Sequence, residues 1–379
     1  MEDASQSFEN TKLKKRVKKH IYFYGSLPPK NKAAYGGGEI GNLRTVKMLR
    51  SLGYDVTTVR KLRSKSSAST FIKLFTYPWR LLDGVVKFFF TVLSGNRKSI
   101  VHISGFGGHT IFNEFLIVAT SKLMGYFTIF EIRGGGYFIN QSKWYVIFRN
   151  WILRHSDYIF SQGMENKPLI EQVCQKPFFY YPNYLEDDFI PKVMPHKPDE
   201  AFNMVFWGRV EKEKNVRLIV ETAAILQKQY NNITLTIIGN GQADYVADIR
   251  NLMRDRLVPG SYELLPGCPH DELRQHLMDK HFYIFPSGQI FEGHSNAVTE
   301  AMAYGIVPVA SPQGFSRTVV GNDELIVDEL SAEQYAKRIA RIIDDNRFNE
   351  LSAFVYNRIQ ENYTYSIVRN KLSDVYSII

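Results

Sequence analysis

The chain has 379 residues, which predicts two or three domains, each large enough to bury a hydrophobic core of its own. Its 47 Lys and Arg residues outnumber its 38 Asp and Glu residues, and the net charge of +9 favours anionic partners such as nucleotides, phospholipids or nucleic acid. No 18 apolar residues run uninterrupted and no apolar run follows the charged N-terminus, so we expect neither an ordinary transmembrane helix nor a secretory signal.

The N-terminal segment, residues 1–19, is predicted to be a disordered basic tail. Residues 1–11 are polar, and the run KLKKRVKK at 12–19 holds six basic residues in eight positions. Such a run is either a solvated or nucleic-acid-binding tail, or a tether to anionic lipid headgroups worth about 1 kcal/mol per basic residue near the surface. The segment itself leaves both interpretations open.

Residues 20–190 alternate short apolar runs with glycine-containing loops, which predicts a parallel sheet covered by helices. The expected strands are 20–24, 54–59, 99–104, 126–132, 157–161 and 178–181. After the first of them, the stretch YGGGEIGN opens a helix, and Gly37 and Gly38 would let the backbone approach a phosphate. The spacing is not that of a dinucleotide fingerprint, and a flexible loop is the alternative.

The segment 71–93 (FIKLFTYPWRLLDGVVKFFFTVL) is predicted to be a helix with more apolar surface than one sheet contact can bury. Trp79, Phe89 and Leu93 belong to one apolar stripe, while Pro78 should kink or divide the helix. The remaining apolar surface indicates a bilayer interface or a partner. An all-round buried helix is the alternative.

The strand at 126–132 runs into Arg133 and three glycines beginning at Gly134. Because these residues follow the carboxyl end of a strand, Arg133 is expected to face the ligand-binding edge, available to an acceptor phosphate, with Gly134 beside it. The alternative is a surface arginine in a turn.

Residues 184–201 are rich in Pro, Lys and Asp and are predicted to link to a second α/β domain, 191–360. Its expected strands are 203–207, 233–238, 262–265, 281–285, 306–310 and 323–327. Arg209 and Lys214 stand between the first of these strands and the following helix, where two cations would clamp a diphosphate. Alternatively, Glu211 and Glu213 simply pair with them.

The stretch 281–311 (HFYIFPSGQIFEGHSNAVTEAMAYGIVPVAS) predicts a strand, a loop, a helix and a strand. Ser295 and Asn296 suit a helix N-cap, and the free N–H groups from Ala297 onward favour a diphosphate. Glu300, on the helix, could accept two ribose hydroxyls, and Glu292, in the loop, could hold sugar hydroxyls. The alternative is that both carboxylates are solvated charges.

These residues carry a family resemblance. Glu292, seven residues, Glu300, then Ala-Met-Ala-x-Gly-x-Pro-Val resembles the motif of retaining GT-B glycosyltransferases of family 4, also called group 1. The resemblance implies an α/β GT-B fold, two doubly wound Rossmann-like domains facing a central cleft, with a final helix, 361–379, crossing back to the first domain. It also implies that Glu300 binds the nucleotide ribose and Glu292 the donor sugar.

The resemblance assigns further roles. Arg209 and Lys214 would contact the donor phosphates, and the loop of Gly37 and Gly38 would face them. The other residues expected to bind the donor are Gly293, His294, Ser295, Asn296 and Ala297. The family often has two histidines two positions apart at the end of the third strand; here the first matches His102, but Ser104 occupies the second position. His109, in the next loop, could substitute as a catalytic group, although a lone histidine is more often structural.

The resemblance implies retaining glycosyl transfer from a nucleotide sugar to a hydroxyl acceptor, here a lipid-linked saccharide in surface polysaccharide synthesis. No D-x-D metal motif occurs, so we expect no metal and no cofactor besides the donor. The expected location is cytoplasmic, bound peripherally to the anionic inner face of the cell membrane. A GT-B-type epimerase or hydrolase is the alternative. Nucleic-acid binding is not expected, because aromatic residues do not interleave with basic ones outside the tail.

Overall fold

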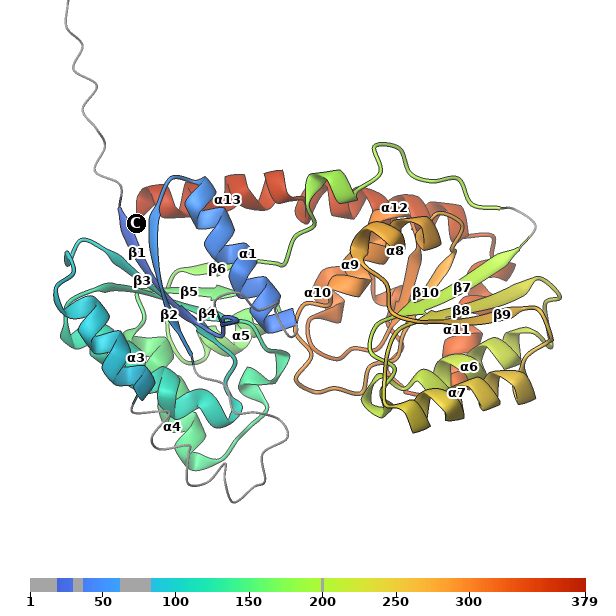
Figure 1. Ribbon diagram of the computed structural model, residues 1–379, viewed down its shortest axis with the longest axis horizontal. Helices are drawn as coiled ribbons and strands as arrows, with labels where there is room; N and C mark the ends of the chain where they lie inside the picture. The colour runs from blue at the N-terminus through green and yellow to red at the C-terminus, as the bar shows by residue number, and fades with distance from the viewer. Residues whose placement is uncertain (1–18, 30–36, 62–82, 199–200) are drawn as a thin grey trace, which may run out of the picture.

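The computed structural model describes residues 19–29, 37–61, 83–198 and 201–379, and contains two parallel sheets with helices on their faces. Figure 1 shows the first sheet with its helices at one end of the molecule and the second at the other. The predicted pair of doubly wound α/β domains is therefore confirmed.

The first sheet has the strand order β2-β1-β3-β4-β5-β6. Its strands are β1 (His20–Gly25), β2 (Asp55–Arg60), β3 (Ile100–Gly105), β4 (Phe127–Ile132), β5 (Tyr158–Ser161) and β6 (Phe178–Tyr180). The central strands are buried on both faces, as their continuous apolar runs require. The helices are α1 (Gly37–Ser51), a helix over 83–93, α3 (Ile111–Leu123), α4 (Lys143–His155) and α5 (Asn166–Glu171), with short 3₁₀ turns η1 (Gly108–Thr110) and η2 (Gly135–Phe138).

The second sheet has the strand order β11-β10-β7-β8-β9. Its strands are β7 (Phe202–Trp207), β8 (Ile233–Ile238), β9 (Tyr262–Leu265), β10 (Phe282–Phe285) and β11 (Val307–Ala310). The helices are α6 (Val216–Leu226), α7 (Ala243–Arg256), α8 (His270–Leu277), α9 (Asn296–Ala303), α10 (Ser316–Val320), α11 (Ala332–Asp344), α12 (Phe348–Asn362) and α13 (Tyr365–Ile378), with 3₁₀ turns η3 (Asp187–Phe189), η4 (Lys212–Lys214) and η5 (Asp323–Leu325).

The prediction of a strand at 323–327 is wrong. This segment forms η5 and makes a single β-bridge, between Ile326 and Ala310. The Asn322 side chain accepts a hydrogen bond from the Glu324 backbone N–H, and this local bond favours a helical turn over an extended strand.

The chain crosses between the sheets twice, and the two crossings lie side by side. Leu185 donates its N–H to the Tyr363 carbonyl and accepts from the Tyr365 N–H. Beyond this point α13 packs on the first sheet, where Leu372 and Tyr376 join its core, and Figure 1 shows this helix lying along that sheet. Helix α13 thus covers the first domain although it follows the second in sequence.

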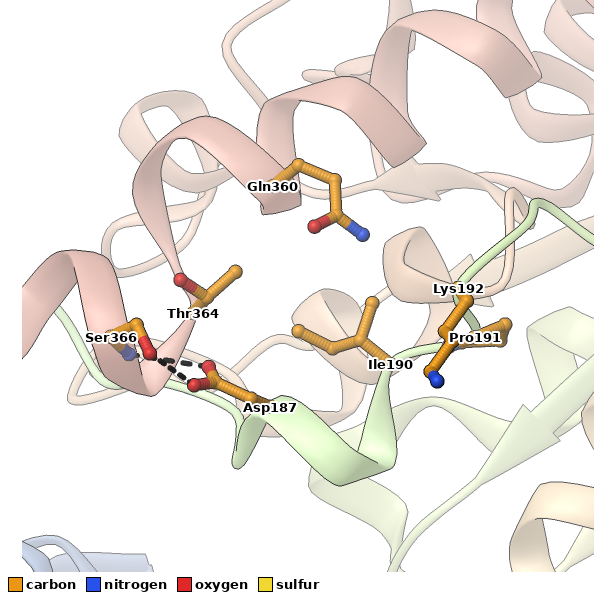
Figure 2. Close-up of a pocket in the computed structure, with 7 residues that line it drawn as sticks. All are labelled: Asp187, Ile190, Pro191, Lys192, Gln360, Thr364 and Ser366. Carbon is orange, nitrogen blue, oxygen red and sulfur yellow. Dashed lines mark hydrogen bonds between the residues drawn. The ribbon is translucent and has the colours of Figure 1, made fainter.

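A cavity of about 350 Å³ opens at the double crossing. Figure 2 shows Ser366 and Asp187 side by side at one edge of this cavity, where both the backbone N–H and the hydroxyl of Ser366 donate to the Asp187 carboxylate. The lining residues are Asp187, Ile190, Pro191, Lys192, Gln360, Thr364 and Ser366.

The helix over 83–93 has one buried and one exposed apolar face. Phe88 and Val92 lie in the core of the first domain. Phe89, Phe90 and Leu93 are exposed to 39%, 64% and 53%, which is unusual for such large apolar side chains. The predicted stripe residues before 83, and the basic run up to residue 18, lie outside the described residues. No described helix is both long and apolar enough to cross a bilayer.

Candidate active site

The loops that leave the carboxyl ends of both sheets meet at the junction of the two domains, the edge at which open α/β sheets bind ligands. On the second sheet, β7 ends at Trp207 and the chain turns at Gly208, whose φ of 146° favours glycine. After η4, Asn215 takes a left-handed conformation and donates its side-chain amide to the Pro286 carbonyl at 2.8 Å. This bond ties the segment carrying Lys214 to the end of β10.

Lys214 and Glu292 form a salt bridge, with 2.5 Å between Nζ and Oε2. The two side chains are only 12% and 16% exposed, so protein shields most of the pair from water. Glu292 also accepts a hydrogen bond from the Ser287 hydroxyl at 2.9 Å. The ammonium group has three donors, so Lys214 could keep Glu292 and still bind a phosphate oxygen.

Arg209 lies close in sequence but is held differently. Its side chain is 64% exposed, and its Nη1 lies 2.8 Å from a carboxylate oxygen of Glu211. The pairing with Glu211 that the sequence left open therefore occurs. An exposed pair of this kind contributes at most about 1 kcal/mol, which leaves the guanidinium able to move to an anionic ligand.

Glu300 is buried, not a solvated charge. It is 4% exposed, and its Oε2 accepts a hydrogen bond from the Trp207 indole N–H at 3.0 Å. Its Oε1 lies 3.7 Å from Nδ1 of His270. A carboxylate fixed at one oxygen presents the other in a defined direction to a hydroxyl donor. Trp207 and His270 were not identified from the sequence. The position of Trp207, at the end of the strand before Gly208 and Arg209, could have indicated a place at the site.

Helix α9 begins as the sequence predicts, with Ser295 at its N-cap and Asn296 and Ala297 in its first turn. The Ser295 side chain makes no capping hydrogen bond. The Asn296 side-chain oxygen accepts a hydrogen bond from the Asn183 side-chain amide at 3.0 Å. Asn183 also donates to the His294 carbonyl at 3.2 Å. The first domain therefore contacts the start of this helix directly.

His294, which the sequence interpretation places in the donor-binding set, has a buried side chain. Its imidazole is buried against the Tyr363 ring, with 5.4 Å between centroids, and neither ring nitrogen has a hydrogen-bond partner among the described residues. Burial, helped by the charge of Arg44, lowers the pKa of His294 to about 3. Neighbouring Gly293 packs against the Arg133 backbone, which an added Cβ would approach to 2.6 Å.

The Arg133 side chain, which the sequence interpretation places at the ligand-binding edge, is also buried. The residue is 4% exposed, and its guanidinium bonds Glu131 at 2.8 Å and the Thr45 hydroxyl at 2.5 Å. Although burial raises the pKa of the Glu131 carboxyl, Arg133 and His102 together lower it below its usual value. Arg133 is thus an internal partner of Glu131. Gly134 remains at the domain junction, in the turn before η2.

His102 belongs to the same buried group. Its Nε2 lies 2.9 Å from Glu131 and its Nδ1 2.6 Å from the Tyr376 hydroxyl on α13. His109 lies elsewhere, in η1. Burial lowers the pKa of His109 and the nearby Lys61 lowers it further, against the opposing effect of Glu114. Both histidines sit at the first sheet, and only His109 is in a loop that leaves it.

Gly37 and Gly38 open α1. A Cβ on Gly38 would lie 2.9 Å from the Phe106 ring, whereas space around Gly37 is open. Within the described residues, no group of three or more His, Cys, Asp or Glu side chains is arranged to hold a metal ion.

Residues 190–361, somewhat less than half of the chain, match the family model described as "Glycosyl transferases group 1". "D-inositol 3-phosphate glycosyltransferase 1" of Catenulispora acidiphila is 27% identical over 157 residues, 39% of this chain and 37% of that protein. "Capsular polysaccharide biosynthesis glycosyltransferase CapM" of Staphylococcus aureus is 22% identical over 189 residues, 47% of each chain. The chain thus matches less than half the length of either relative.

The whole fold has solved counterparts. Anabaena Alr3699/HepE, solved in complex with UDP, gives a TM-score of 0.69 at 11% identity, and the match covers 95% of this chain and 100% of that one. At this identity the likeness establishes a shared two-domain fold. It agrees with the GT-B architecture expected from the sequence.

Proposed function

We propose that this protein is a glycosyltransferase that moves a sugar from a nucleoside-diphosphate sugar to a hydroxyl acceptor. The observation that carries the proposal is the shielded salt bridge of Lys214 with Glu292, which lies in the loop that leads into α9, the helix that carries the buried carboxylate of Glu300. A cation, a helix N-terminus and two carboxylates suit the diphosphate, the ribose and the sugar hydroxyls of one donor molecule. The group 1 domain match supports the same activity.

The chemistry follows from these groups. When the bond between the anomeric carbon and the diphosphate breaks, negative charge develops on the leaving phosphate oxygen. Lys214, Arg209 and the N–H groups at the start of α9 would stabilise that charge before any solvent reorganises. Glu292 would accept hydrogen bonds from the donor sugar. Under this proposal the transfer retains the anomeric configuration and needs no metal ion.

For the acceptor, we favour a lipid-linked saccharide presented at the anionic inner face of the cell membrane. The support is the exposed face of the helix over 83–93, where Phe89, Phe90 and Leu93 form an apolar surface on the first domain. The CapM relative, named for capsular polysaccharide biosynthesis, makes a surface polysaccharide the first acceptor class to test.

The decisive experiment is a thermal-shift screen of nucleoside diphosphates and their sugars, starting with the uridine series because Alr3699/HepE was solved with UDP. A ligand at 100 times its dissociation constant adds about 2.7 kcal/mol of stability. Donors that stabilise the protein are then incubated with candidate acceptors, and release of nucleoside diphosphate is measured. If no nucleotide sugar stabilises the protein or is consumed, the proposal fails. Rapid consumption of donor without any acceptor would instead identify a hydrolase or epimerase.

A further inference from the structure

Glycines from three chain segments meet where the first domain touches the loop that carries Glu292. Gly135 and Gly136 follow β4, Gly293 follows Glu292, and Gly314 follows β11. The Gly135 N–H donates a hydrogen bond of 3.0 Å to the Glu292 carbonyl, linking the backbones of the two domains. Because the Arg133 guanidinium is buried, an acceptor phosphate does not explain why three glycines follow it.

This contact leaves no room for side chains. A Cβ on Gly135 would lie 2.3 Å from the Glu292 carbonyl oxygen and 2.6 Å from the Cα of Gly314. A Cβ on Gly314 would also lie 2.3 Å from that oxygen, and Gly314 has a φ of +66°. These neighbours are backbone atoms, which cannot rotate away as a side chain would. The two domains therefore approach at a distance that only glycine permits.

The same contact completes the fixation of Glu292. Its carboxylate is held by Lys214 and the Ser287 hydroxyl, and its N–H donates to the Gln289 carbonyl at 3.0 Å. The Glu292 carbonyl accepts the hydrogen bond from Gly135. Removing this bond would leave the Glu292 carbonyl unbound and loosen the backbone that positions the proposed sugar-binding carboxylate.

We propose that Gly135, Gly136, Gly293 and Gly314, the glycine clasp, position Glu292 for glycosyl transfer by docking the first domain on the donor loop. The inference rests on the proposed function and adds positioning residues to it. The hydrogen bond from Gly135 to the Glu292 carbonyl both joins the two domains and fixes the Glu292 backbone, so contact between the domains would itself position Glu292. Nucleotide binding should not depend on the bond from Gly135, since Glu300 and Trp207 both lie on the second domain.

Gly136 supplies an internal control. A Cβ there would lie 2.1 Å from the Phe291 ring, and Phe291 is 63% exposed. Shortening this side chain removes the obstruction. Phe291→Ala should therefore rescue Gly136→Ala but not Gly135→Ala, whose obstruction is backbone. Gly84→Ala is the matched control on the helix over 83–93, where the nearest atom is 3.5 Å away.

The experiment compares transfer kinetics, nucleotide affinity and amide hydrogen exchange in these variants. Gly135→Ala should lower kcat by about 10²-fold, the effect of misplacing a reacting group by about 1 Å, with nucleoside-diphosphate affinity unchanged. Exchange should rise in the peptides spanning 133–138 and 290–294. Gly136→Ala should show a smaller loss that Phe291→Ala reverses, and Gly84→Ala should match wild type.

Wild-type kcat and exchange in Gly135→Ala would overturn the inference. So would rescue of Gly135→Ala by Phe291→Ala, because the obstruction would then not be backbone. Lost nucleotide affinity in Gly135→Ala would show damage to the second domain and likewise contradict a positioning role. If wild type transfers no sugar from any donor, the proposed function fails on its own. Unchanged exchange in Gly135→Ala then refutes the clasp separately.

Discussion

The hydrogen bond from Trp207 to Glu300 gives the sharpest test of the proposed nucleotide site. Both residues are nearly buried, and 3.0 Å separates the indole nitrogen from the carboxylate oxygen. If Glu300 binds the ribose, Glu300→Ala removes hydrogen bonds to a charged acceptor, worth about 1.5–3 kcal/mol. Affinity for the nucleoside diphosphate should then fall roughly 10- to 150-fold.

Trp207→Phe keeps the carboxylate but removes the donor that fixes its direction. We expect a smaller affinity loss, about tenfold, because the ribose then binds a carboxylate that must first be ordered. The two effects should not add: once Glu300 is alanine, Trp207→Phe has no carboxylate left to misplace. A double-mutant cycle in nucleotide affinity, measured by titration calorimetry, isolates this coupling.

Trp151→Phe makes the same chemical change in the first domain, where the indole stacks on His155, and should leave nucleotide affinity at the wild-type value. Normal nucleotide binding by Glu300→Ala would refute a ribose-binding role of Glu300. Trp207 would act on the nucleotide independently of Glu300 if Trp207→Phe weakened binding as much in the Glu300→Ala background as in wild type, and its positioning role would then be refuted.

Three other predictions follow from the site, the buried histidines and the exposed helix. Lys214→Ala should cut turnover by about 10²–10³-fold, as loss of one preorganised charge donor does, and wild-type activity should persist in EDTA. Burial lowers the pKa values of His281 and His294 to about 4 and about 3, so both stay neutral in the folded protein at pH values where the unfolded chain binds protons. Their contribution to the free energy of unfolding is therefore fully present above about pH 6.5. It falls as pH drops toward 3, by up to about 1.4 kcal/mol per pH unit for each histidine. The protein should co-sediment with anionic but not neutral vesicles, and Phe89→Ser with Phe90→Ser should weaken that binding.

Each of these has its own control. Arg254→Ala, on the exposed surface of α7, should leave turnover unchanged, and activity lost in EDTA but restored by magnesium would contradict the metal-free mechanism. Denaturant titrations of His294→Leu should show a shallower fall of stability with acid; a slope equal to wild type would mean that His294 titrates normally. Phe354→Ser, on the second domain, should not alter vesicle binding, and a wild type that ignores anionic vesicles at low salt defeats the membrane proposal.

The sequence predicted the positions of the strands and helices better than the directions of the side chains. Strand ends, helix caps and motif spacing are local, so the positions of Lys214, Glu292 and Glu300 followed from the pattern. The direction of a side chain depends on its partners. Arg133, just beyond β4, points inward because Glu131 on that strand offers a buried carboxylate. His102 bonds Glu131 and Tyr376, which lies on α13. No local sequence pattern identifies such partners, because they come from other strands and helices.

Under the proposed function, the salt bridge between Lys214 and Glu292 keeps both charged groups paired until the donor binds. Two partly buried charges of opposite sign are costly to separate, and removing one would leave the other unpaired at a cost of several kcal/mol. A donor that brings a diphosphate to Lys214 and hydroxyl donors to Glu292 would bond both side chains while they remain paired. A free diphosphate satisfies only the lysine, and a free sugar only the glutamate. We therefore infer that an intact nucleotide sugar binds Lys214 and Glu292 better than either half alone, a preference that arises from the pair and from neither residue by itself.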